Sequence, residues 1–432
     1  MYASRVILEK IKMVLLDEIL KKAEYFDGVI QARHSIQGLV LPTVVLPPAG
    51  REDYQTGNYE NCAIWTGIYV AAQSLRFAVT GDAQAREQAK SGLLALHRLQ
   101  EVTGESGLIA RGYKTGYEQT WDEEFFWKKE RDKTRQRDEW HQSTGYRWLG
   151  DASKSQVFGV VFGYFTFSEF CNPTKKEREE IGRYLSNVVD RIMSSGLKII
   201  DKDKQVSGYG NYSPKQYLGY GGIGPFLILS KLKLAFQIAG QEGYETEYRR
   251  LLGEEDYVRF LKRGRLDAPI LRQLLTSSGH EDNLAMLNYY MLMTLETDEE
   301  LRKLCREGLD KRWNAINDPE NSLFNFIYHA LMQVKTPALE RGVDALLRFP
   351  TKKQVHAIAL KRKLPKSRIE VVMDTFTPRK IPIELRPIDE YAWRVNPLRH
   401  DLWVGGKVGT MEFTGVDFLI ATYLGLYHGF IR

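Results

Sequence analysis

Three acidic residues stand where the sequence predicts the beginnings of helices: Glu60, Asp151 and Asp417. Two carboxyl groups held roughly 5–9.5 Å apart can hydrolyse a glycosidic bond, one as the acid and the other as the nucleophile or base. We predict Asp151 as the acid or nucleophile and Glu60 as its partner. A structural role is equally open for each residue, because a carboxylate stabilises the positive end of a helix dipole.

Asp151 belongs to the most informative stretch of the chain, GYRWLGDASKSQVFGVVFGY (Gly145–Tyr164). Aromatic residues and a glycine precede a short polar box, and a helix rich in small residues follows. A loop of this kind can line a sugar cleft at the mouth of a helix. Four further residues of the stretch are predicted to contact a substrate: Trp148, Ser153, Ser155 and Gln156.

The same stretch also has a purely structural interpretation. Asp151 could cap the helix by accepting hydrogen bonds from the backbone N–H groups of its first turn. Gly159 and Gly163 would then serve to let neighbouring helices pack closely. The sequence alone does not decide between a cap and a catalytic acid.

Other loops carry residues suited to sugar recognition. Arg111 lies between small residues, where it could grip a carboxylate through two parallel hydrogen bonds; a structural ion pair is the equal alternative. Tyr209 neighbours glycines, and we predict that it and Trp148 are exposed platforms for a sugar ring. Asn283 lies on an apolar helix and could point into a central lumen or be a buried structural amide. The other predicted substrate or rim contacts are Tyr212, Arg386, Trp393 and Arg394.

Eliminative cleavage of a uronate would need different groups. A base must remove the proton next to the carboxyl group, and a cation or amide must neutralise that carboxylate. The candidates in predicted loops are Asn61, Arg111, His141, Tyr146, Arg147 and Tyr212. A polysaccharide lyase is therefore an alternative to a hydrolase.

The composition allows a full hydrophobic core, since 43% of the 432 residues are hydrophobic and 12% are aromatic. A net charge of +6 is mild, and we expect no nucleic-acid partner. The three cysteines and eight histidines lack ligand spacing, so we expect no metal. GYGGIG (Gly219–Gly224) follows no hydrophobic strand, so we expect no dinucleotide and no other cofactor.

The N-terminal residues combine an apolar helical pattern with charges throughout, unlike a secretory signal. No window reaches the roughly 18 uncharged apolar residues that a membrane span needs. We therefore expect a soluble, cytoplasmic protein without a membrane partner. The sequence leaves its oligomeric state open.

Hydrophobic periodicity predicts about twelve helices. Tight turns such as Thr80–Asp82 and Asn172–Pro173 join successive helices, which must therefore be antiparallel neighbours. Residues 104–149 are predicted to be a loop excursion over the cleft, and residues 351–410 an irregular segment with strands, best seen at Ile369–Met373. The best fit is an all-α single domain over residues 1–432, an (α/α)6 toroid with a few short strands. An open α-solenoid is the alternative, but no fixed-period repeat appears.

Four motifs carry a family resemblance: GNYENCAIWTGIYVAAQSLRFAVTGD, VTGESGLIARGY, YRWLGDASKSQVFG and GVDFLIATYLGLYHGFI. In order and spacing they resemble a family of microbial proteins of the six-hairpin glycosidase-like type. The resemblance covers residues 55 to 432 and implies an (α/α)6 barrel. The wider superfamily includes glycoside hydrolases, unsaturated glucuronyl hydrolases and polysaccharide lyases, so a carbohydrate substrate is implied as well.

One position departs from the pattern expected of that family, which has an acidic residue where this chain has Ser155. We predict a glycoside hydrolase that cleaves an oligo- or polysaccharide, with uronate-containing glycans among the candidates. A polysaccharide lyase on the same barrel is the first alternative. A non-catalytic glycan-binding relative or an inactivated variant is the second, because Ser155 would then replace a catalytic acid, natively or by engineering.

Overall fold

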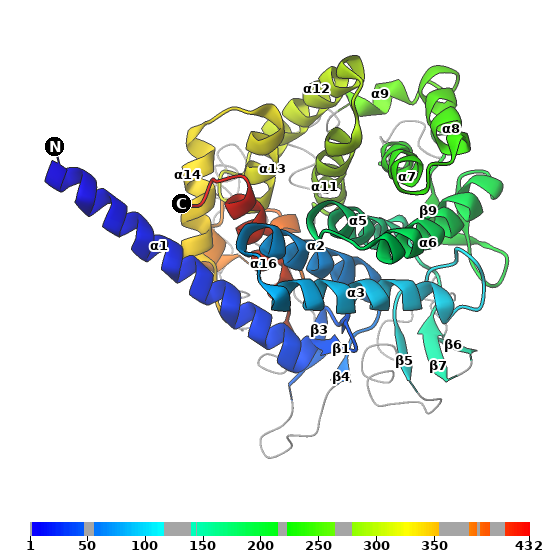
Figure 1. The fold of residues 1–432 in the computed structure, drawn as a ribbon, viewed down its shortest axis with the longest axis horizontal. Coiled ribbons are helices and arrows are strands. Elements are labelled where there is room, and N and C mark those ends of the chain that lie inside the picture. The colour runs from blue at the N-terminus through cyan, green and yellow to red at the C-terminus, as the bar shows by residue number, and fades with distance from the viewer. Residues whose placement is uncertain are drawn as a thin grey trace, which may run out of the picture.

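The computed structural model describes residues 2–46, 56–115, 140–143, 145–214, 223–263, 279–353, 380–386, 389–397 and 411–432. Helices dominate these residues, and the strands among them are short (Figure 1). The prediction of a mostly helical protein is therefore confirmed. The buried hydrophobic residues form one cluster that runs from Ile19 to Ile431.

Six of the described helices are buried around most of their circumference, because their apolar residues are not confined to one stripe. In chain order, each of them contacts the next, and the last returns to the first. These inner helices are α2 (Cys62–Thr80), α5 (Lys154–Phe170), α7 (Gly224–Ala239), α11 (His280–Leu295), α13 (Ser322–Met332) and α16 (Val416–Tyr427).

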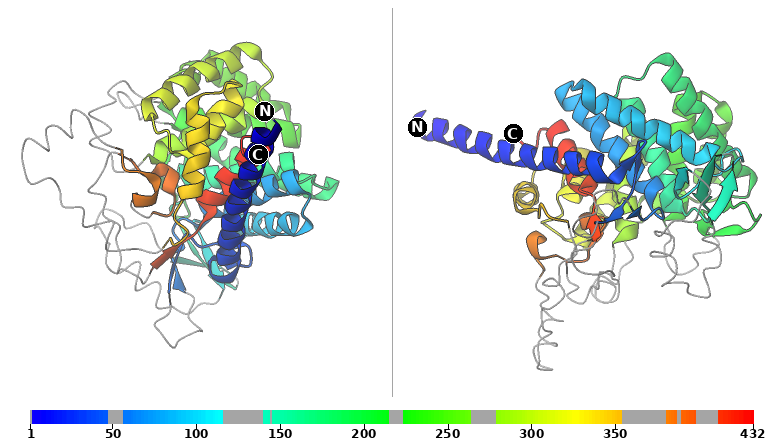
Figure 2. Two further views of the ribbon diagram at one scale, coloured as in Figure 1. Left: turned by 90° about the vertical axis from the view of Figure 1, so that its left-hand side faces the viewer. Right: turned by 90° about the horizontal axis from the view of Figure 1, so that it is seen from below.

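Six further helices lie outside them and bury only one face (Figure 1). They are α1 (Tyr2–Val29), α3 (Ala83–Glu101), α6 (Lys175–Ser194), α8 (Glu242–Gly253), α12 (Glu299–Ile316) and α14 (Pro337–Arg348). Three of them bridge two inner helices: α3 packs on α2 and α5, α6 on α5 and α7, and α12 on α11 and α13. The short α9 (Val258–Leu261) follows α8. The N-terminal end of α1 projects beyond the other helices (Figure 2).

Tight turns join each of the first five inner helices to the outer helix that follows it. Gly81 and Gly240, both in the left-handed conformation, end α2 and α7. Asp82, Thr174 and Asp298 then cap α3, α6 and α12 through their side chains. Inner helices linked in this way through antiparallel partners run parallel to one another, so their N-terminal ends gather at one end of the fold.

The short strands lie in segments that lead into the inner helices, and all pair antiparallel. Strand β3 (Thr43–Val45) lies between β10 (Met411–Phe413) and β4 (Thr56–Gly57), with Val45 opposite both Met411 and Thr56. This sheet ties the segment before α16 to the segment before α2. The other strands are β1 (Ser35–Ile36) paired with β2 (Leu39–Val40), β7 (Tyr146–Leu149) between β5 (Tyr113–Thr115) and β6 (Trp140–Ser143), and β8 (Lys198–Ile200) paired with β9 (Val206–Asn211).

The described parts of residues 104–149 contain the sheet of β5, β7 and β6, in agreement with the prediction of a few short strands. Helix α5 begins at Lys154, and its N-cap is Ser153, so Asp151 does not cap it. The strand predicted at Ile369–Met373 lies outside the described residues.

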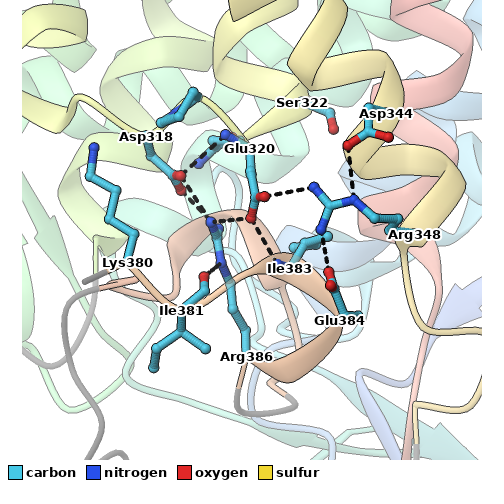
Figure 3. A network of polar contacts seen from close by, with 12 residues as sticks. Asp318, Glu320, Ser322, Asp344, Arg348, Lys380, Ile381, Ile383, Glu384 and Arg386 are labelled. Carbon is cyan, nitrogen blue, oxygen red and sulfur yellow. Dashed lines mark hydrogen bonds and ion pairs between the residues drawn. The ribbon is translucent and has the colours of Figure 1, made fainter.

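A polar network holds residues 380–386 against the start of α13 (Figure 3). Both terminal nitrogens of Arg386 donate to Asp318 at 2.8 Å, and both side chains are almost fully buried. Glu320 accepts from Arg348 at 2.6 Å and lies 3.6 Å from Arg386. The prediction that Arg386 is a rim contact for a substrate is therefore wrong, because its guanidinium is enclosed by this network.

Helix α2 is the one helix in the described parts of the chain that is long and apolar enough to cross a membrane. However, 78% of its apolar window is buried inside the protein. It also carries Arg76, which pairs with Asp27 and Asp82 at 2.8 and 2.6 Å. These are features of a helix in the core of the fold.

Candidate functional site

Arg111 joins the two residues predicted to be catalytic. Its Nη2 donates to the Glu60 carboxylate at 3.0 Å, and its Nε donates to the Glu60 carbonyl oxygen at 2.9 Å. Its Nη1 donates to the carbonyl oxygen of Asp151 at 3.2 Å. Arg111 is 8% exposed. The structure therefore brings Glu60, Arg111 and Asp151 together, and Arg111 is occupied in holding the other two.

Asp151 has a positive φ of 53°, in the left-handed region. Residues other than glycine, asparagine and aspartate seldom adopt this backbone conformation. Its backbone N–H donates to Asp201 at 2.7 Å, and its Oδ1 accepts from the N–H of Gly208 at 2.8 Å. These bonds and Arg111 fix the residue between the end of β7 and strand β9. Backbone conformations of this kind gather at functional sites, so the catalytic prediction for Asp151 stays open.

The polar residues that follow Asp151 (Ser153, Ser155 and Gln156) are buried and stabilise the helix starts. Ser153 and Gln156 form the capping box of α5, and the Ser155 hydroxyl lies 2.7 Å from that of Ser153. Gln156 also donates to the Asn61 side chain at 2.9 Å and to the Glu60 carbonyl at 3.3 Å. Ser153, Ser155 and Gln156 were predicted to contact substrate; the structure has them hold the start of α5 against the start of α2.

Glu390 is a buried acid at this end of α2 that the sequence did not single out. Its Oε2 accepts two hydrogen bonds of 3.1 Å, one from Asn61 Nδ2 and one from Trp65 Nε1. Burial raises the pKa of Glu390 above its usual value. The nearby charges of Asp389 and Glu60 also raise it, whereas Arg394 and the hydrogen bond from Trp65 lower it. Glu390 is therefore an acid whose protonated form is favoured by its surroundings.

Arg394 is the cation next to Glu390. It lies 3.4 Å from Glu390 and 2.7 Å from Asp389, and its guanidinium stands 5.7 Å from the Trp65 ring centre. Burial, and secondarily Arg394, lower the pKa of His280 to about 4, so His280 is a neutral imidazole near pH 7. Arg394 was predicted to contact substrate; in the structure its guanidinium pairs with Asp389 and also lies against Glu390.

Residues 389–394 cross the N-terminal ends of four inner helices. Glu390 binds α2 as described, and the Arg394 carbonyl accepts from Gly279 N–H, just before α11, at 2.6 Å. The Trp393 carbonyl accepts from Asn321 at the start of α13 at 2.8 Å. Asp417 of α16 accepts from the Ala392 N–H at 2.7 Å. The segment, which includes the short helix η4 (Ala392–Arg394), thus assembles polar groups from one end of the fold.

Several predicted site residues lie elsewhere than expected. Trp148 lies on β7 with no exposed surface and packs 4.3 Å from the His141 ring, so the expectation of an exposed platform is wrong. Trp393 is 1% exposed and donates to the Asp417 carbonyl at 2.7 Å, so it is not a rim contact. Asp417 has no exposed surface and pairs with Lys353 at 2.5 Å. Because this pair is structural, Asp417 loses its place among the catalytic candidates.

Three further predicted contacts differ in their exposure. Tyr209 on β9 is 61% exposed, as a platform requires, and its role as one stays a prediction. Tyr212 has no exposed surface. Asn283 on α11 is fully buried, and within the described ranges neither polar atom of its side chain has a hydrogen-bond partner. Trp65 is 1% exposed, and its indole N–H donates to Glu390.

The described residues contain no group of three or more His, Cys, Asp or Glu side chains that could hold a metal ion. No protein-family model matches the chain, and no curated protein matches it. The functional assignment therefore depends on the geometry of this site. The only sequence signal for Glu390 is its place in the acidic and aromatic run IDEYAW, which does not indicate Asn61 and Trp65 as its partners.

Proposed function

We propose that this protein is a glycoside hydrolase on an (α/α)6 toroid and that Glu390 is its general acid. The observation that carries the proposal is the buried carboxyl of Glu390, with its raised pKa, beside Glu60. Hydrolysis of a glycosidic bond needs an acid that keeps its proton near neutral pH and a second carboxylate. Burial raises the pKa of Glu390 in the direction that the first requirement asks for, and Glu60, paired with Arg111, fits the second.

The contacts of Glu390 suggest which oxygen carries the proton. Its Oε2 accepts N–H groups from both Asn61 and Trp65, so Oε1 is the oxygen left to be protonated. In the proposed reaction, Oε1 gives this proton to the oxygen of the leaving sugar while Glu60 attacks the anomeric carbon or activates water. Asp151, the acid or nucleophile predicted from sequence, remains the alternative partner because Arg111 holds it beside Glu60.

Each inner helix contacts the next in chain order, and the last contacts the first. These contacts, with the six outer helices around them, support the toroid rather than an open solenoid. The resemblance to six-hairpin glycosidase-like proteins agrees with both parts of the proposal. We take the substrate to be an oligo- or polysaccharide. The three cysteines are buried and unpaired, which suits the cytoplasm.

A polysaccharide lyase is the second candidate. The neutral His280 next to Arg394 supports it, because a lyase needs a base and a cation near the substrate carboxylate. It fits less well, because Arg394 already pairs with Asp389 and Glu390. A non-catalytic glycan binder is the third candidate, with Ser155 at the expected acidic position.

The test is a screen of glycans and aryl glycosides with the wild-type protein, Glu390→Gln and a control, Glu105→Gln. Glu105 pairs with Arg191 and Lys204 away from the site, so its replacement should leave activity unchanged. Loss of a general acid lowers kcat about 10²–10⁴-fold. This loss should be largest for natural glycans and smallest for aryl glycosides, whose leaving group needs no proton.

New reducing ends, lost in Glu390→Gln, support the hydrolase. Equal losses for natural and aryl substrates would reject Glu390 as the acid. Products with the ultraviolet absorbance of an unsaturated uronate would establish the lyase. If both the wild-type protein and Ser155→Asp bind glycans without cleaving them, the protein is a non-catalytic glycan binder.

A further inference from the structure

A hollow of about 200 Å³ lies on the outer wall of the fold. It is found between η1 (Ile30–His34), the π-helix that follows α1, and the first half of α3 (Figure 1). Tyr69 of α2 is 1% exposed and closes the hollow on the inside, whereas Gln84 and Ser91 are exposed, so the hollow opens to solvent. Pockets that enclose a drug-sized molecule measure about 300–1,000 Å³. This hollow is smaller and suits a single ring of a larger ligand.

Polar side chains line the hollow. Six of them carry an amide, a hydroxyl or a carboxyl group: Gln31, Ser35, Gln84, Glu87, Gln88 and Ser91. Among the described residues, no cationic and no aliphatic side chain contributes to the lining. An anion and an apolar ligand are therefore disfavoured. Side-chain amides, like the hydroxyl groups of a sugar, both donate and accept hydrogen bonds, so the lining matches a neutral ligand rich in hydroxyl groups.

Glu87 is the charged residue of this described lining. Its side chain is exposed, and no ion pair of Glu87 occurs within the described ranges. The neighbouring cations of α3, Arg86 and Lys90, pair instead with Glu177 of α6 at 2.9 and 3.3 Å. No described cation therefore neutralises the Glu87 carboxylate, which stays a charged acceptor. A hydrogen bond from a hydroxyl group to a charged acceptor is stronger than one between two neutral groups.

The π-helix η1 forms one wall of the hollow. Such wide turns are rare and occur frequently at functional sites. Here the N–H of Ser35 donates to the carbonyl oxygen five residues earlier. On one side of the turn, Arg33 donates to Glu412 of β10 at 2.7 and 2.9 Å. On the other side, Gln31 Nε2 donates to the Tyr69 hydroxyl at 2.6 Å. The turn is thus fixed on both sides and places Gln31 and Ser35 at the hollow.

The other walls are equally well fixed. The Tyr69 hydroxyl donates to the buried Asp27 at 2.7 Å, and Arg76 also donates to Asp27, at 2.8 Å. Gly38, in the turn between β1 and β2, has a φ of 84°, and a Cβ built on it would lie 2.2 Å from the Ser91 carbonyl oxygen. This turn therefore lies directly on α3. A site whose walls are held before a ligand arrives loses less entropy on binding.

We propose that this hollow binds one neutral sugar ring of a glycan, with Glu87 and the amides of Gln31 and Gln88 bonded to its hydroxyl groups. The hollow shares no lining residue with the site of Glu390, so it is a second site that holds a glycan on the outer wall. Its use in holding a substrate for cleavage rests on the proposed function. Binding of the sugar itself does not.

The experiment is a titration of the full chain with methyl glucoside, methyl galactoside and methyl mannoside, followed by saturation-transfer difference NMR. Choline and inorganic phosphate are titrated as a cation and an anion. Glu87→Ala should weaken glycoside binding about tenfold or more, as expected for a lost hydrogen bond to a charged group. Gln88→Met keeps the length of the side chain but removes its amide, so it should weaken binding about two- to tenfold. Glu307→Ala is the matched control, because Glu307 is an exposed glutamate of the outer helix α12 without an ion pair in the described ranges.

The site is supported if at least one glycoside binds, if both changes in the hollow weaken it, and if the control binds like the wild-type protein. The proposal is overturned if none of the three glycosides binds, if choline or phosphate binds as tightly as they do, or if either Glu87→Ala or Gln88→Met leaves the affinity intact. Repeating the titration with Glu390→Gln separates this result from hydrolysis. Glycoside binding in that variant, weakened again by Glu87→Ala, supports the hollow even where the hydrolase proposal fails.

Discussion

Gly67 of α2 lies directly against Gly159 of α5. A Cβ built on Gly67 would lie 1.8 Å from the Gly159 carbonyl oxygen, and one built on Gly159 would lie 2.3 Å from the Ile64 Cα. No side chain fits at either position, so the two helix backbones are in contact. The same crossing brings Gln156 within 2.9 Å of Asn61 and so aligns the starts of both helices around Glu60.

Gly159→Ala should destabilise the protein by about 3 kcal/mol or more, because the methyl group overlaps backbone atoms that cannot yield without separating α2 from α5. Urea unfolding followed by circular dichroism measures the effect. Gly182→Ala is the matched control: on the outer helix α6 the added Cβ would lie 3.4 Å from its nearest neighbour. That change should stabilise the protein by about 0.5–1 kcal/mol. Similar effects of the two changes would contradict the close-crossing interpretation.

The close packing at Gly159, the helices and the turns between them could be predicted from sequence because their signals are local. The turn predicted at Thr80–Asp82 lies where α2 ends and α3 begins, and the turn predicted at Asn172–Pro173 lies between α5 and α6. Apolar spacing sets the length of each helix, and residues such as Gly81 and Asp82 end one and begin the next.

The site was less predictable because its contacts join distant parts of the chain. Glu390 binds Trp65, which is 325 positions away, and no local pattern indicates such a partner. Trp148 illustrates the opposite error. Its neighbouring glycine suggested an exposed loop, but pairing of β7 with β5 and β6 buries the ring, and strand pairing depends on segments that local spacing does not connect.

Trp65→Phe should shift the pH dependence of hydrolysis. The change keeps the ring next to Tyr391 but removes the hydrogen bond that lowers the pKa of Glu390, so that pKa should rise further. A general acid must be protonated, so kcat/KM falls as the pH rises through this pKa. In the pH profile of kcat/KM, the decrease at alkaline pH should therefore occur about 0.5–1 pH unit higher. This shift assumes about 1 kcal/mol for the hydrogen bond.

The matched control for this shift is Trp313→Phe, which removes an indole bond of 2.9 Å to Asn325. Its alkaline limb should stay in place. A limb that also stays in place in Trp65→Phe would show that Glu390 is not the group that titrates.

Asp318→Asn should destabilise the protein by about 3–5 kcal/mol, because it leaves the buried Arg386 without its bidentate partner. Glu320, at 3.6 Å, compensates only in part (Figure 3). Glu384→Gln is the control in the same network, since the pair of Glu384 with Arg348 is exposed, and its loss should cost at most about 1 kcal/mol. Thermal unfolding ranks the two variants. Equal losses would mean that burial does not determine the strength of these pairs.

Lys231 on α7 has no exposed surface, and Lys231→Met should stabilise the protein in a pH-dependent manner. The lysine titrates near 7 when folded and near 10.5 when unfolded, so below about pH 7 folding must bury a charged amine that methionine avoids. The gain there should approach about 5 kcal/mol, since the pKa difference is about 3.5 units and each unit corresponds to about 1.4 kcal/mol. Between these two pKa values the unfolded chain holds the extra proton, so the stability of the wild-type protein rises with pH relative to the variant. The difference should disappear near pH 10.5, as urea titrations across this range can measure; a constant difference would mean that Lys231 is not buried in its charged form.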